Sequence, residues 1–373
     1  MKIFKSDAFR ISLIYFFATR ILLILISYCV LNEFGLYGIK KKSTITFYDN
    51  ALLNTWGNFD TGWYLNIAEN WYPDIHKSQV SSGLEKFSFF PLYPGLIRLI
   101  HFMTGIDYFI VGLLISNLCL LISGWFLYSL AEKIYNKDIA LWSVIFMYVF
   151  PVSFIFSGVF TESLYLMLIL GTIYFSLTEK WFVSGLCAMF LILCRPVGVF
   201  VFFPLVFIYY KNKKFKLRET DRSILNLFFI PTGVFFLLLL NYFNSGDPLM
   251  FVHHPGYTST ISNPLHNLYE GLTNNYFTFS FISVFTFIFI LFWLLFYKHL
   301  QLLFHIIVAY SLFIPMSYGM MSMPRMMLAA FPLFILLASV AVKYKLQNIF
   351  VIAFTLFQGY LFVCWCLGFG NVI

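Results

Sequence analysis

The chain has 373 residues, of which 61% are hydrophobic and 11% are charged, and its mean hydropathy is +0.84. This composition excludes an ordinary water-soluble domain. The formal net charge of +8 does not indicate nucleic-acid binding, because the basic residues are concentrated in short breaks between apolar runs.

Continuous apolar runs make up most of the sequence. Many contain about 20 residues, enough for a helix to cross a hydrocarbon core of roughly 30 Å. Because a segment in lipid must satisfy its own backbone, and these runs do not alternate as barrel strands do, they predict helices. The predicted fold class is an all-α polytopic membrane protein, with a single integral-membrane domain over residues 1–373 and membrane lipids around it.

We predict eleven transmembrane segments. The first is a retained span rather than a signal peptide, because the apolar stretch contains no small-residue cleavage site. In chain order the segments are 9–31, 107–131, 139–157, 161–178, 181–194, 196–210, 223–243, 277–297, 299–317, 324–342 and 347–369. The six cysteines lie within apolar runs and show neither a disulfide framework nor a zinc spacing.

The basic residues orient these segments. The densest cluster lies at 211–222, and the positive-inside rule makes it a cytoplasmic loop, with an anionic-lipid site as the alternative. This orientation places the long segments 32–106 and 244–276 outside, together with nearly every unusual polar residue. The triplet 40–42 is all lysine and then also lies outside, against the rule.

Two predicted segments are short for a bilayer and meet at Arg195-Pro196. Proline removes a backbone donor and breaks a helix, and broken helices at membrane depth usually line a cavity. A single tilted helix over 181–210 would invert every later loop and move the basic cluster outside. We therefore predict a hairpin that carries Arg195 at the external side.

Asp60 is the clearest indication of chemistry, since it is an acidic residue between aromatics in the first external loop. Trp63, Ile67 and Trp71 follow at helical spacing, with Tyr64 beside them, and predict an amphipathic helix on the membrane surface. Aspartate is also a favoured N-cap. The residues alone leave open whether Asp60 only caps this helix or acts as a general base.

Three more charged residues are expected near the external surface. Glu162 begins a span, where it either complements the helix dipole or serves as a carboxylate at the rim of a cavity. Arg195 and Arg325 are expected at comparable depths, where arginine binds phosphate through two parallel hydrogen bonds. The alternative for both arginines is a plain interface anchor.

Arg98, His253 and His254 have weaker signals. Arg98 is either a phosphate contact or a snorkelling side chain. The histidine pair suggests metal or substrate binding, but no further metal ligands occur at useful spacing.

Residues 58–68, NFDTGWYLNIA, resemble the motif W-D-x-x-(W/H)-(Y/F)-x-x-I-A of the PIG-V-like mannosyltransferases. This family has the GT-C glycosyltransferase fold and includes the second mannosyltransferase of GPI-anchor synthesis. Further segments are similar to the family in the same order: 89–94 (FFPLYP), 150–151 (FP) with 160–164 (FTESL), 194–196 (CRP), 246–249 (GDPL), and 324–325 (PR) with 331–332 (FP). Phe59 departs from the family's usual tryptophan, and Trp71 from its frequent glycine.

The resemblance implies an inverting transferase that moves a sugar, expected to be mannose, from dolichyl or undecaprenyl phosphate to a lipid-linked or glycan acceptor. It implies Asp60 as the general base, with Glu162 as the next candidate, and no cofactor, metal or nucleotide sugar. The residues expected to bind the donor are Arg195, Arg325, His253, His254, Arg98, Trp63 and Tyr64. The site is expected at the exoplasmic face of a prokaryotic cell (inner) membrane, or of the endoplasmic reticulum membrane in a eukaryote.

Other functions stay open. One is a GT-C enzyme that uses another polyprenyl-phosphate sugar. A lipid or sugar transporter or flippase would require ionisable residues near mid-membrane, where Arg20 is the clearest example, and internal repeats, which are not evident. A non-catalytic scaffold is the third.

Overall fold

In the computed structural model, residues 7–39, 46–73, 83–253 and 261–369 are described, and every regular element among them is helical. The α-helices are α1 (Asp7–Ile39), α2 (Ala51–Asn54), α3 (Thr61–Asn70), α4 (Leu92–Thr104), α5 (Tyr108–Ile134), α6 (Lys137–Val149), α7 (Glu162–Leu177), α8 (Trp181–Cys194), α9 (Phe202–Asn212), α10 (Phe229–Ser245), α11 (Met250–His253), α12 (Pro264–Leu272), α13 (Phe277–Leu295), α14 (Leu302–Tyr318), α15 (Met323–Met326), α16 (Pro332–Tyr344) and α17 (Gln347–Cys366). The 3-10 helices are η2 (Leu84–Ser88), η3 (Ser153–Ser157), η4 (Pro196–Val201), η5 (Leu217–Glu219), η6 (Arg222–Phe228), η7 (Tyr297–His299) and η8 (Met327–Ala329). The predicted all-α class is confirmed.

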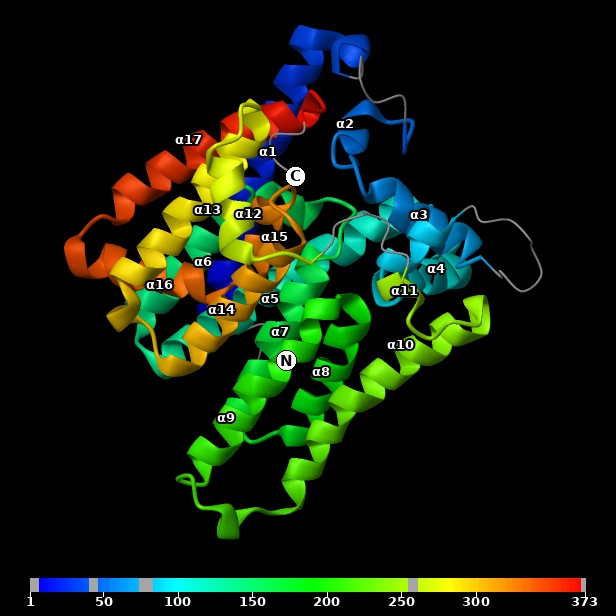
Figure 1. The fold of residues 1–373 in the computed structure, drawn as a ribbon. Helices are drawn as coiled ribbons and strands as arrows, with labels where there is room; N and C mark the ends of the chain where they lie inside the picture. The colour runs from blue at the N-terminus through cyan, green and yellow to red at the C-terminus, as the bar shows by residue number, and fades with distance from the viewer. Residues whose placement is uncertain (1–6, 40–45, 74–82, 254–260, 370–373) are drawn as a thin grey trace.

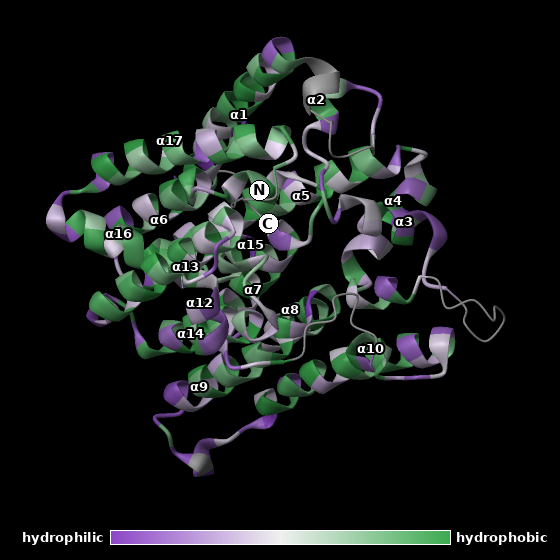
Figure 2. Cartoon of the chain, turned by 45° about the horizontal axis from the view of Figure 1, so that its top comes forward, coloured by the Kyte–Doolittle hydropathy of each residue, from purple (hydrophilic) through white to green (hydrophobic). Residues whose placement is uncertain are grey.

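Among the described residues, five helices are long and apolar enough to cross a bilayer: α1, α5, α13, α17 and the continuous stretch Arg222–Ser245. A sixth crossing is reached if Met323–Ala329 and Pro332–Tyr344, which are bent by 82°, form one broken span. Figure 2 shows these helices coloured predominantly hydrophobic. They are compatible with an integral membrane protein. The prediction of eleven spans is not confirmed, because α7, α8, α14 and η4–α9 are shorter apolar helices.

The predicted helical span 139–157 is wrong as one helix. Helix α6 ends at Val149, and Phe150 has a ψ of 138°, outside the helical region. The cause is Pro151, because the ring of a proline disfavours helical geometry at the residue before it. The chain then passes through η3 to Glu162, and every residue from 150 to 161 is buried. A buried connection that contains one short 3-10 helix but no α-helix therefore runs through the protein core.

Arg20 of α1 supplies hydrogen bonds to this buried connection. Its guanidinium donates to the carbonyl oxygen of Ser153 at 3.2 Å, to the hydroxyl of Ser157 at 2.9 Å and to the carbonyl oxygen of Tyr148 at 3.3 Å. The Gln358 amide of α17 donates to the same Tyr148 carbonyl at 3.0 Å. Backbone carbonyls freed at a helix end must find such donors when water is excluded.

The helices pack as a bundle around α5, which contacts α1, α6 and α7 (Figure 1). Helix α7 packs against α8, α8 against α10, and α6 against α16. The aromatic composition fills this core, with ring pairs such as Phe150–Phe334, whose centroids are 5.3 Å apart.

The chain reverses at Arg195-Pro196. The beginning of α8 lies beside the end of α9, where the rings of Trp181 and Tyr209 are 5.3 Å apart between centroids. The two helices are therefore antiparallel. The start of α8 and the end of α9 lie at the hydrophilic connection 211–221, which leads into η6 and α10 (Figure 2). The basic cluster thus lies at the opposite end of these helices from Arg195.

Replacing Arg20 should weaken the whole bundle. Arg20→Met removes the guanidinium donor from the Ser153 carbonyl and the Ser157 hydroxyl, and we expect a loss on the order of 2–4 kcal/mol of unfolding free energy. Arg10→Met, on an exposed site of the same helix, is the control and should change stability little. Thermal unfolding of the purified variants in detergent measures both, and equal melting temperatures would contradict the bracing role of Arg20.

The orientation predicted from the basic residues can be tested with single cysteines in a cysteine-free background. Asn66 of α3 and Asn212 at the end of α9 are both exposed. Asn66→Cys should react with a membrane-impermeant thiol reagent added to intact cells, whereas Asn212→Cys should react only after the cells are opened. Labelling of position 212 from outside would reverse the orientation.

Candidate functional site

Four charged side chains from distant parts of the chain meet in one cluster, which we call the charge cluster: Asp60, Glu162, Arg195 and Arg325. The Asp60 carboxylate pairs with Nη1 of Arg325. Oε1 of Glu162 lies 3.3 Å from Nε of Arg325 and 3.2 Å from Nη1 of Arg195. The contacts form a chain in which negative and positive groups alternate.

The charge cluster is almost entirely shielded from solvent, with relative exposures of 7% for Asp60, 2% for Glu162, 9% for Arg195 and 6% for Arg325. Two carboxylates and two guanidiniums balance in formal charge, which is the condition under which buried charges are tolerated. Neither Glu162 oxygen accepts a geometrically acceptable hydrogen bond from any described residue. Unused acceptor and donor capacity inside a charged cluster is a feature of binding sites.

Asp60 occupies the N-cap position of α3, but its side chain makes no capping hydrogen bond there. The cap alone therefore does not explain this residue, because its carboxylate is directed to Arg325. The preceding Phe59 has a φ of 47°, a left-handed conformation that is costly for a side chain of this kind. Such strain is typical of functional sites.

Trp365 at the end of α17 holds the segment before Asp60. Its indole N–H donates to the carbonyl oxygen of Thr55 at 2.8 Å, and its own carbonyl accepts from the Asn58 amide at 2.9 Å. Gly57 permits a separate close approach to α5, because a Cβ there would meet the Phe109 ring at 2.7 Å. The start of α3 is thereby fixed against the bundle.

Glu162 is the first residue of α7, at the end of the buried connection described above. Arg195 lies between α8 and η4 with φ −154° and ψ 144°, the extended geometry favoured before a proline. Its guanidinium lies 5.9 Å from the centroid of the Tyr165 ring and donates to the sulfur of Met326 at 2.9 Å. Helix ends thus bring Glu162 and Arg195 to the same place.

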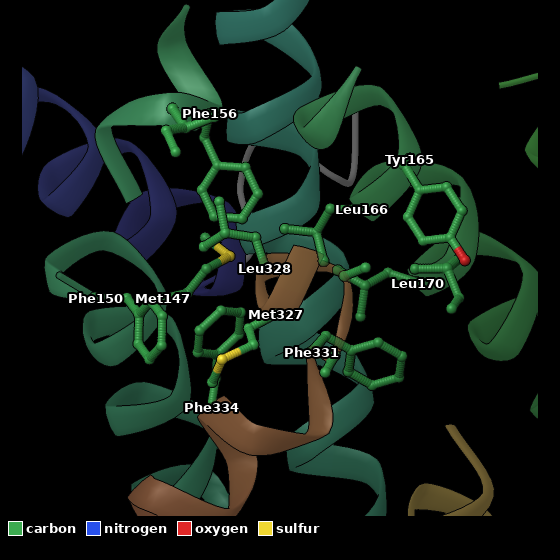
Figure 3. Packing of buried hydrophobic residues seen from close by; sticks show 14 of the residues in the cluster. Met147, Phe150, Phe156, Tyr165, Leu166, Leu170, Met327, Leu328, Phe331 and Phe334 are labelled. Carbon is green, nitrogen blue, oxygen red and sulfur yellow. The ribbon is translucent and has the colours of Figure 1, made fainter. Parts of the chain in front are cut away.

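Arg325 lies on α15, just before the 82° bend that leads into α16. Its guanidinium carbon is 5.5 Å from the centroid of the ring of Phe160, which lies two positions before Glu162 in sequence. The segment after Arg325 is anchored by apolar packing. Figure 3 shows Met327, Leu328, Phe331 and Phe334 among side chains of the α6 end and of α7, including Met147, Phe150, Leu166 and Leu170.

Aromatic residues of the predicted motifs form one wall near the charge cluster. The Tyr64 ring packs edge-on against Phe89 and Tyr93 of the segment 89–94, at 5.3 and 5.4 Å between centroids. The Tyr64 hydroxyl lies 3.4 Å from that of Thr161, next to Glu162. Burial, and then the nearby carboxylates Glu162 and Asp60, raise the pKa of Tyr64 well above its ordinary value, so its phenol stays protonated. Trp63 stacks on Phe89 at 5.6 Å.

The predicted donor-binding residues Arg98 and His253 make their contacts outside the charge cluster. Arg98 donates to the carbonyl oxygens of Ala68 and Glu69 at 3.0 and 2.9 Å, at the far end of α3 from Asp60. His253 pairs through Nδ1 with Asp247 at 2.6 Å in the segment after α10. His254 lies outside the described residues.

The sequence also suggested metal binding by the pair His253-His254. Within the described residues, no three His, Cys, Asp or Glu side chains gather closely enough to hold a metal ion.

The sequence indicated all four charged residues but not how they pair. It also did not indicate that Trp365 anchors the segment before Asp60 or that the Phe160 ring lies against Arg325. Trp365 lies in an ordinary apolar run, and no local pattern distinguishes it. The segment FTESL did place an aromatic residue two positions before Glu162, which is the only sequence signal that could have indicated Phe160.

No protein-family model matches the chain, and no curated protein matches it significantly.

The charge balance of the cluster predicts a large loss of stability when one arginine is removed. Arg325→Ala leaves two buried carboxylates with one arginine, and breaking such a pair costs about 3–5 kcal/mol. Arg98→Ala, which removes hydrogen bonds to two carbonyl oxygens and a contact with the Trp71 ring, is the control and should cost less. Thermal unfolding in detergent measures both variants, and equal losses of melting temperature would contradict the electrostatic account.

Proposed function

We propose that the protein is an inverting glycosyltransferase that moves a sugar, with mannose expected, from a polyprenyl-phosphate donor to a lipid-linked or glycan acceptor. One observation carries the proposal: Asp60 lies buried in one cluster with Glu162, Arg195 and Arg325. These four residues belong to four separate segments that resemble the PIG-V-like mannosyltransferases. Residues that the resemblance selects one by one are thus neighbours in space.

In the proposed reaction, Asp60 accepts the proton of the acceptor hydroxyl. The acceptor oxygen forms a bond to the anomeric carbon as the bond from that carbon to the phosphate oxygen breaks. The bonding electrons leave with the phosphate, and attack from the opposite side inverts the anomeric centre. A positioned general base contributes roughly 10²–10⁴-fold to such a rate.

Arg325 and Arg195 are the proposed phosphate ligands. Guanidinium groups match phosphate oxygens in geometry, and in a buried site they stabilise developing negative charge strongly. Arg325 already contacts the proposed base, so acceptor, sugar and leaving group would meet at one place. Under the predicted orientation this place is at the exoplasmic face.

In the sequence, Arg20 was the clearest support for the transporter alternative. Its contacts in the structure weaken that support. Its guanidinium is directed at carbonyls and hydroxyls of the buried connection and is 5% exposed. An arginine used in this way stabilises the fold. A GT-C enzyme acting on another polyprenyl-phosphate sugar remains the nearest alternative, since the charge cluster recognises phosphate rather than a particular sugar.

The direct test incubates purified protein with labelled polyprenyl-phosphomannose and a cell lipid extract and identifies products by mass. Asp60→Asn should abolish transfer, because an amide cannot accept the proton, while donor binding is retained. Glu69→Gln, an exposed carboxylate on the same helix, is the matched control and should transfer normally. Near-wild-type turnover by Asp60→Asn would remove Asp60 as the base and make Glu162 the next residue to test.

A further inference from the structure

Arg325 is shared by two carboxylates that hold different parts of its guanidinium. Nη1 pairs with Asp60, and Nε lies 3.3 Å from Glu162. A donor phosphate that approaches Arg325 through Nη1 therefore competes with Asp60, and one that approaches through Nε competes with Glu162. The fold holds the two carboxylates with different firmness, so a phosphate would displace one of them from Arg325 more easily than the other.

Glu162 is the more firmly held of the two. It begins α7, a helix packed against α5 and α8, and its carboxylate also lies 3.2 Å from Arg195. Its relative exposure is 2%. Asp60 instead precedes the ten-residue helix α3, which has exposed residues along one side. Releasing Asp60 requires only rotation of its side chain on the fixed start of α3, whereas moving Glu162 would disturb the centre of the bundle.

The proposed reaction also moves charge between the partners of Arg325. Before transfer, Asp60 carries one negative charge and the phosphodiester carries one. After transfer, Asp60 is protonated and neutral, and the released polyprenyl phosphate monoester carries up to two. One unit of negative charge has passed from one side of Arg325 to the other, so an arginine able to exchange these partners stabilises both states.

We infer that Arg325 exchanges Asp60 for the donor phosphate while Glu162 retains its Nε, and that Glu162 is a positioning residue for this exchange. The inference rests on the proposed function. In the resting state Arg325 is paired with Asp60, the proposed general base. Donor phosphate takes the Nη side, and Asp60 is released to accept a proton only when a sugar donor is present. Glu162 keeps both arginines aligned for the phosphate throughout.

Two isosteric substitutions test the inference, with the sugar-free polyprenyl phosphate as the probe and its dissociation constant as the readout. Each removes one negative charge from the cluster, so simple electrostatics predicts tighter binding in both. The exchange predicts opposite signs. Asp60→Asn removes the competitor, and affinity should rise roughly tenfold, whereas Glu162→Gln releases Arg325 and Arg195 from their alignment, and affinity should fall roughly tenfold. Changes of the same sign would overturn the inference.

If the proposed function itself is wrong, the arginine variants distinguish this from a failure of the exchange alone. Unchanged affinity in both Arg195→Ala and Arg325→Ala would remove the phosphate site itself. Weaker binding in the arginine variants, together with equal shifts in Asp60→Asn and Glu162→Gln, would keep the phosphate site and reject the exchange.

A measurement on the unmodified protein covers the case in which Glu162→Gln fails to fold. A water-soluble carbodiimide labels accessible carboxylates, and labelled positions are found by peptide mass spectrometry. Polyprenyl phosphate should increase labelling of Asp60 several-fold and leave Glu162 protected, because only Asp60 loses its arginine. Constant or reduced labelling of Asp60 at saturating polyprenyl phosphate would overturn the exchange.

Discussion

The candidate site depends on the mutual neutralisation of four buried charges. A carboxylate or guanidinium transferred alone into an apolar interior loses several kcal/mol of hydration free energy. Asp60, Glu162, Arg195 and Arg325 avoid this cost only as a group, because each positive side chain lies beside a negative one. The helices that carry them are consequently fixed relative to one another by electrostatics as well as by apolar packing.

The local backbone explains how such a group is assembled. Proline ends α8 at Arg195 and ends α6 before Pro151, so that charged residues fall at helix ends rather than in lipid-facing helix centres. Asp60 and Arg325 lie on short helices whose neighbouring segments are anchored elsewhere, by Trp365 in one case and by the apolar packing in Figure 3 in the other. Irregular backbone is thus concentrated where the chemistry is proposed.

Much of the fold class followed from the sequence, because long apolar runs have few structural solutions in lipid. The sequence also marked each member of the charge cluster, since an ionisable residue in an apolar chain is conspicuous. Its pairing was not predictable, because Asp60 and Arg325 are 265 positions apart and carry no shared local pattern. The prediction of one helix over 139–157 was wrong for a local reason. Pro151 disfavours helical geometry at Phe150, and this outweighs the continuous hydrophobicity of the segment.

The partners of Arg20 have a consequence for biosynthesis. In a bilayer, Arg20 would enter with α1, whereas its partners Ser153 and Ser157 are synthesised more than a hundred residues later. Gln358, which also bonds Ser153, would arrive with α17. An arginine in a lipid-exposed helix is costly until it finds acceptors. In a bilayer, α1 would therefore not reach its final environment on its own. Its insertion would stay incomplete until residues 150–161 have been synthesised, and the buried connection would be complete only when α17 joins them.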